Sequence, residues 1–106
     1  MAQVKINSGI CGFATTVVAE SEDMQTTALK ITSECPNYKP LEMELTEADG
    51  FVECFAKVGE GKIYETCRKY CKHAACPVPS GIIKAIEVAC RLALPKDVCF
   101  GIMNKK

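Results

Sequence analysis

The sequence predicts an α+β domain over residues 1–106, with a small sheet of about four strands covered on one face by helices. Three observations predict this class. The first third of the chain alternates polar and apolar side chains, the middle changes to helical spacing, and an apolar run returns near the end. The expected order, β-β-β-α-α-α-α-β, places three N-terminal strands and one C-terminal strand in one sheet.

The N-terminal strands follow from a period of two residues. Residues 2–7 alternate in polarity, residues 13–20 are rich in β-branched side chains, and residues 26–33 alternate again. Gly9 and Gly12 bracket a turn between the first two strands, because glycine adopts positive φ without steric cost. This pattern predicts a hairpin followed by a third strand.

The middle of the chain predicts helices. Residues 41–45 favour a short helix, and Thr46 is the predicted cap of the next helix, with acidic residues in its first turn. Residues 62–73 have the spacing of a helix with one apolar side. Ser80 is the predicted cap of a last helix, which Pro95 ends.

The last predicted element is a strand over residues 98–103, because the run from Val98 to Met103 is apolar. We expect it to join the three N-terminal strands. No internal repeat, low-complexity segment or long linker interrupts the sequence, so we expect one domain.

Charge and hydropathy exclude several classes. Thirteen Lys and Arg balance thirteen Asp and Glu, so the surplus of cations typical of nucleic-acid binding is missing. No apolar run reaches the roughly 18 residues of a membrane span. The residues after Met1 lack the apolar core of a secretory signal. We therefore expect a cytoplasmic protein that binds neither nucleic acid nor membrane.

The eight cysteines are the unusual feature of the composition. A reducing cytosol argues against a disulfide framework, and no C-x-x-C pair is present. Three roles stay open: apolar filler in the core, ligands of a metal or cluster, and redox or nucleophilic thiols. We expect filler at the positions that fall on helices or strands, which are Cys54, Cys67, Cys90 and Cys99.

The leading hypothesis is a small accessory protein that binds zinc or an iron–sulfur cluster without catalysis of its own. Cys11 lies between glycines, and Cys35 and Cys76 each precede a proline. Glycine lets backbone N–H groups approach a thiolate, and proline stiffens the loop that carries the ligand. Cys71 or His73 would complete a tetrahedral set.

Two other hypotheses use the same residues differently. Cys76 lies four residues before the predicted Ser80 cap, so the helix start could lower its pKa and make it a nucleophile. Alternatively, Ser80 and Gly81 at the same helix start would bind a small anion. The third hypothesis is an interaction module with structural thiols, which binds a protein partner or forms a homodimer through an exposed strand edge.

Several segments together resemble a small, single-domain, cysteine-rich family of uncharacterised proteins from anaerobic bacteria and archaea. They are SGICGF at residues 8–13, SECP at residues 33–36, ACPVPSGIIKAIEVA at residues 75–89 and LALPKDV at residues 92–98. The resemblance spans nearly the whole chain and implies an anaerobic, reducing cytosol. It implies no activity, and its motif cysteines are Cys11, Cys35 and Cys76.

Overall fold

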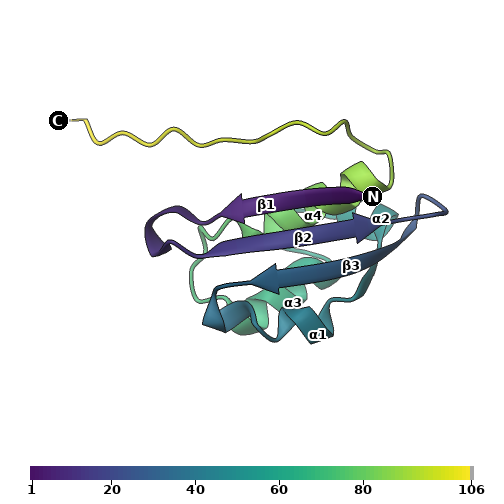
Figure 1. Cartoon of the computed structure of the whole chain (residues 1–106), viewed down its shortest axis with the longest axis horizontal. Helices are drawn as coiled ribbons and strands as arrows, with labels where there is room; N and C mark the ends of the chain where they lie inside the picture. Colours follow the sequence, from purple (N-terminus) through teal and green to yellow (C-terminus); the bar gives the residue numbers. More distant parts are fainter. Residues whose placement is uncertain (106) are drawn as a thin grey trace.

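The computed structural model describes residues 1–105 and has an α+β fold (Figure 1). Four strands form one sheet in the order β1-β2-β3-β4, with every neighbouring pair antiparallel. The strands are β1 (Ala2–Asn7), β2 (Ala14–Glu20), β3 (Thr26–Ser33) and β4 (Glu47–Asp49). The predicted fold class and the three N-terminal strands are confirmed.

One face of this sheet is buried and the other meets solvent. Along β3 every second residue is buried, as a period of two residues requires. The strand register places Val4 opposite Val17, and Val17 opposite Ile31, so these side chains form one row that points into the core.

Helices cover the buried face of the sheet. They are the 3-10 helix η2 (Pro36–Tyr38) and the α-helices α1 (Leu41–Glu44), α2 (Gly50–Phe55), α3 (Lys62–Tyr70) and α4 (Val78–Ala89), whereas the 3-10 helix η1 (Gly9–Cys11) forms the exposed turn between β1 and β2. Helix α4 packs against β1 and β2, whereas α1 packs against β3 and α3 packs against α4 (Figure 1). The short helix predicted near residue 41 is confirmed.

Helix α4 approaches β1 very closely. Ile82 and Ile86 of this helix are fully buried in the core. A Cβ atom at Gly81 would overlap the end of the Ile6 side chain on β1, so any larger residue would force Ile6 to shift within the packed core. The contact places the first turn of α4 beside the end of β1.

A buried carboxylate joins α2 to α3. Glu53, on α2, is only 4% exposed. Its two oxygens accept the backbone N–H groups of Lys62 at 3.1 Å and Ile63 at 2.8 Å, which are free donors in the first turn of α3. Glu53, on the preceding helix, therefore caps α3. Its carboxylate leaves no room for a Cβ atom at Gly61.

The predicted C-terminal strand is wrong. Within the described part of the chain, residues 98–103 lie outside any strand, and the fourth strand is β4 instead. Thr46 is likewise not a helix cap: its carbonyl accepts the N–H of Leu29 at 2.8 Å, which draws the following residues into the sheet. Helix α2 begins later and is capped by Asp49, whose carboxylate accepts two backbone N–H groups.

Two helix boundaries also differ from prediction. Helix α4 begins at Val78, so Ser80 lies inside its first turn and is not a cap. Pro79 suits an early helical position because it has no N–H group to leave unpaired. Helix α3 ends at Tyr70, three residues before the predicted His73.

The close approach at Gly81 yields a stability prediction. We expect Gly81→Ala to lower the free energy of unfolding by about 1–3 kcal/mol, because the added methyl group overpacks the contact with Ile6. The loss should appear although alanine favours helices by about 1 kcal/mol over glycine. Urea unfolding followed by circular dichroism measures it.

The matched control is Gly101→Ala, since a Cβ atom there meets nothing within 4 Å. Its midpoint should equal that of the unmodified chain. A Gly81→Ala variant as stable as this control would contradict the packing argument.

Candidate thiol site

The structure places all five predicted metal ligands at one end of the sheet. Cys11 lies in η1 between β1 and β2, and Cys35 follows the end of β3. Cys71, His73 and Cys76 lie in the connection between α3 and α4. Figure 1 shows this connection passing the same end of the molecule as the β1–β2 hairpin and the end of β3. The topology thus brings together segments that are distant in sequence.

Although the five predicted ligands lie at one end of the sheet, their side chains do not converge on one point. Cys11 is exposed, whereas Cys35, Cys71 and Cys76 pack partly against the core. The side chain of His73 is exposed, and its backbone carbonyl, not its ring, accepts the S–H group of Cys71 at 3.2 Å. Within residues 1–105, no group of three or more His, Cys, Asp or Glu side chains has a geometry that could hold a metal ion.

Two of the predicted ligands do come together, beside a tyrosine. The hydroxyl of Tyr38 donates a hydrogen bond to Sγ of Cys76 at 3.2 Å. Cys71 lies close enough to both groups to raise the pKa of Tyr38 and of Cys76, while its own S–H group donates to the carbonyl of His73. Cys67, one helical turn before Cys71, lies behind them and is only 1% exposed. We call Tyr38, Cys67, Cys71 and Cys76 the thiol cluster.

No pattern in the sequence singled out Tyr38 as a site residue. Its side chain is 2% exposed and belongs to η2, which Pro36 begins. The N–H of Tyr38 donates to the carbonyl of Cys35 at 3.0 Å, so the turn that follows Cys35 orients the ring toward the cluster. A lone aromatic residue between two prolines was the only available signal, and it does not indicate which thiol the ring will reach.

Burial controls the protonation of the cluster. It raises the pKa of Cys76, and this effect outweighs the hydrogen bonds from Tyr38 and from the N–H of Val78, which both lower that pKa. Burial also raises the pKa of Cys67 to about 12, and it raises the pKa of Tyr38. The N–H at the start of α4 therefore acts in the predicted direction, but the expectation of a lowered Cys76 pKa is wrong.

The two donors of the predicted anion site are engaged within their own helix. The hydroxyl of Ser80 donates to the carbonyl of Pro77 at 3.1 Å, and the N–H of Gly81 donates to the same carbonyl at 3.0 Å. Ser80 is exposed, and Gly81 faces Ile6 of β1. Neither group is free to meet an anion in this arrangement.

The remaining cysteines divide between core and surface. Cys90 is buried, and its thiol lies 3.1 Å from the hydroxyl of Thr27. Cys54 is half-buried, and burial raises its pKa to about 11. Cys99, which we expected to fill the core, is exposed because the segment around it forms no strand.

A comparison with known protein families matches residues 2–102 of the chain to a family of unknown function, DUF6951. The chain belongs to this family. The match agrees with the resemblance to an uncharacterised family. No curated protein and no solved structure matches the chain. Among residues 1–105, no helix combines the length and the apolar character needed to cross a membrane.

The hydrogen bond from Tyr38 yields a prediction about reactivity. In Tyr38→Phe the thiolate of Cys76 loses a donor, so we expect the pKa of Cys76 to rise further. The rate of alkylation of Cys76 at neutral pH should fall about tenfold for each unit by which its pKa rises. Peptide mass spectrometry after timed treatment with iodoacetamide, over a range of pH, measures the shift.

Tyr64→Phe is the control, because Tyr64 lies on the outer side of α3 and lines a groove away from the cluster. It should leave the pH profile of Cys76 unchanged. An unchanged or faster reaction of Cys76 in Tyr38→Phe would contradict the assigned contact.

The raised pKa values also predict sensitivity to alkali. The folded chain keeps the Cys67 proton up to a pKa of about 12, whereas the unfolded chain releases it near the ordinary value of 9.0. The contribution of this thiol to stability is thus complete below pH 9 and is lost as the pH rises toward 12. Urea unfolding under reducing conditions should show a falling free energy of unfolding in that window.

Cys67→Val should make this fall shallower, because valine has no proton to lose. Cys11→Ser should leave the slope unchanged, since Cys11 is exposed. A slope that is the same in Cys67→Val and in the unmodified chain would contradict the assignment to Cys67.

Proposed function

We propose that the chain is a thiol–disulfide exchange protein whose exchanging pair is Cys71 and Cys76. One observation carries the proposal: the Tyr38 hydroxyl donates to Cys76 at 3.2 Å, and Cys71 lies close enough to both groups to raise their pKa values. Both are half-buried, so they lie at the boundary between core and solvent, where a substrate can reach them. By contrast, Cys11 and Cys99 are exposed and do not pack against the core within the described residues.

The proposed reaction transfers two electrons to a disulfide substrate. One thiol of the pair loses its proton and attacks a substrate sulfur, which breaks the substrate S–S bond and releases the first substrate thiol. The second thiol of the pair then attacks the mixed disulfide and releases the second substrate thiol. The protein ends with a Cys71–Cys76 disulfide, and the two protons pass to the two substrate thiols.

The high pKa of Cys76 has a consequence for this reaction. Because a thiolate is the attacking species, exchange is slow at neutral pH and accelerates as the pH rises. Tyr38 assists by donating to the sulfur when it becomes negative. A reducing cytoplasm in an anaerobic cell, which the family resemblance implies, would keep the pair as thiols until a substrate arrives.

The binding of zinc or an iron–sulfur cluster is the second candidate. It is favoured by the proximity of the Cys67, Cys71 and Cys76 thiols, since Cys71 and Cys76 both raise the pKa of Cys67, and Cys71 raises that of Cys76. Metal binding would have to remove protons that burial holds in place, so it would strengthen with rising pH. Cys35 and Cys11 lie at the same end of the sheet and are the remaining ligands that this candidate can recruit.

Each candidate is tested on its own preparation, and the first preparation tests exchange. The protein is purified under anaerobic, metal-free conditions, incubated with a glutathione disulfide buffer and digested for peptide mapping. We expect a Cys71–Cys76 disulfide, seen as the loss of two hydrogens from the joined peptides. In Cys71→Ser or Cys76→Ser the remaining thiol should instead be trapped as a mixed disulfide with glutathione.

Cys99→Ser is the control and should still form the Cys71–Cys76 disulfide. Glutathione bound only at Cys11 and Cys99 would overturn the exchange proposal. Elemental analysis of protein purified anaerobically without chelators decides the second candidate, which fails if zinc and iron are both absent.

A further inference from the structure

The C-terminal tail, residues 94–105, leaves apolar side chains in solvent. It follows α4 as an extended segment without helix or strand (Figure 1). Val98, Phe100 and Ile102 are 63%, 78% and 94% exposed. Contiguous apolar surface of this kind marks an interaction site in a water-soluble chain.

The spacing of these residues is that of a strand in a half-covered sheet. Val98, Phe100 and Ile102 lie at every second position and would share one face, with Cys99, Gly101 and Met103 on the other. Polar residues bound the segment, with Asp97 before it and Asn104 after it. Strands β1 to β3 have the same alternation, with one face in the core.

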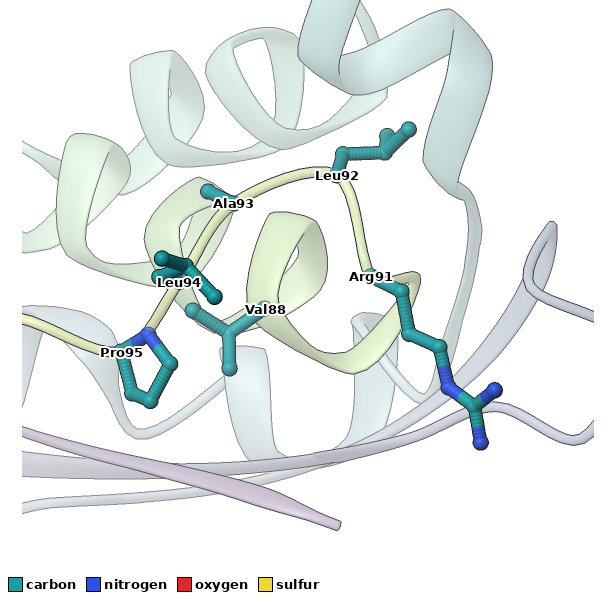
Figure 2. A pocket seen from close by; sticks show the side chains of 6 residues that line it. All are labelled: Val88, Arg91, Leu92, Ala93, Leu94 and Pro95. Carbon is teal, nitrogen blue, oxygen red and sulfur yellow. The ribbon is translucent and has the colours of Figure 1, made fainter.

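The sheet has a free edge that such a strand fits. In the order β1-β2-β3-β4, β1 pairs only with β2, so its outer backbone groups have no strand partner within the described residues. Beside that edge, Val88 of α4 and the residues Arg91–Pro95 line a mainly apolar groove of about 430 Å³ (Figure 2). A strand added at β1 would continue the sheet beneath α4.

The direction of the tail points to the edge of another molecule. Figure 1 shows the tail running in the same direction as β1 and ending beyond the β1–β2 hairpin. Pairing with its own β1 would therefore be parallel, in a sheet whose other pairs are all antiparallel. A second copy related by a two-fold axis perpendicular to β1 presents its β1 in the opposite direction, which allows the antiparallel ladder that is slightly more stable.

We propose that two copies of this chain form a dimer in which residues 98–103 of each tail add to the free edge of β1 in the other copy. A two-fold exchange of this kind pairs both edges and both tails at once, so neither copy keeps an unpaired strand. It would cover Val98, Phe100 and Ile102 in each copy. The inference is independent of the proposed function, because it involves neither Cys71 nor Cys76.

The test measures the mass of the full chain in solution. Light scattering after size-exclusion chromatography, with reductant present to prevent disulfide-linked dimers, should give twice the chain mass. Phe100→Pro removes a backbone N–H in the middle of the proposed strand and should halve the measured mass. Because Phe100 lies outside the core, this variant should keep the thermal stability of an isolated folded chain.

Asn104→Pro is the matched control, since it places the same residue just beyond the proposed strand, and it should remain a dimer. Hydrogen exchange should show protection of residues 2–7 and 98–103 in the dimer, and the loss of both in Phe100→Pro. A full chain that is a monomer would overturn the proposal, whether its tail amides are protected by its own β1 or not. A dimer that persists in Phe100→Pro would overturn it as well.

Discussion

The close contact between α4 and β1 determines where the other elements can lie. Because Gly81 has no side chain, α4 packs directly on Ile6 and inserts Ile82 and Ile86 into the core. This depth places the start of α4, and with it Cys76, at the end of the sheet where η2 presents Tyr38. The thiol cluster is therefore a consequence of helix-on-sheet packing, and a residue without a side chain makes it possible.

Burial then decides the chemistry of the cluster. The first turn of α4 offers an N–H group to Cys76, and Tyr38 offers a hydroxyl, yet removal of water from the sulfur outweighs both. The charged form of a thiol loses more by desolvation than two donors restore. The same cause acts at Cys67, deeper in the core. A site built in this way holds protonated thiols at neutral pH and releases reactive thiolates only when the pH rises or a ligand displaces the proton.

The two edges of the sheet, β4 and β1, differ in what they contact. At one edge, the short strand β4 pairs with β3 and leads directly into α2, whose Glu53 caps α3. At the other edge, β1 is open, and the tail with a matching apolar pattern runs in the same direction as β1 without pairing (Figure 1). The β4 edge therefore takes part in packing within the chain, whereas the β1 edge is available to a second chain.

Local patterns alone were sufficient for the elements whose evidence lies within a few residues. The alternation in residues 2–7 and 26–33 predicted β1 and β3, and the loop positions of Cys35 and Cys76 singled out two thiols that reach the same end of the fold. The boundaries near Thr46 and Ser80 were wrong. The helix predicted to begin at Thr46 begins later, because the Thr46 carbonyl accepts a hydrogen bond from Leu29 in the sheet. The helix predicted to begin at Ser80 begins earlier, because Pro79 is suited to an early helical position.

The sequence by itself determined the fold class, the three N-terminal strands and the grouping of cysteines in loops, because periodicity and turn residues act locally. Only the tertiary structure decided that Tyr38 joins Cys71 and Cys76, that Cys11 stays apart in solvent, and that burial raises the pKa of Cys76. It also decided that residues 98–103 remain unpaired within the chain. These outcomes depend on contacts between residues far apart in sequence, and on how much water each contact excludes, which no local pattern specifies.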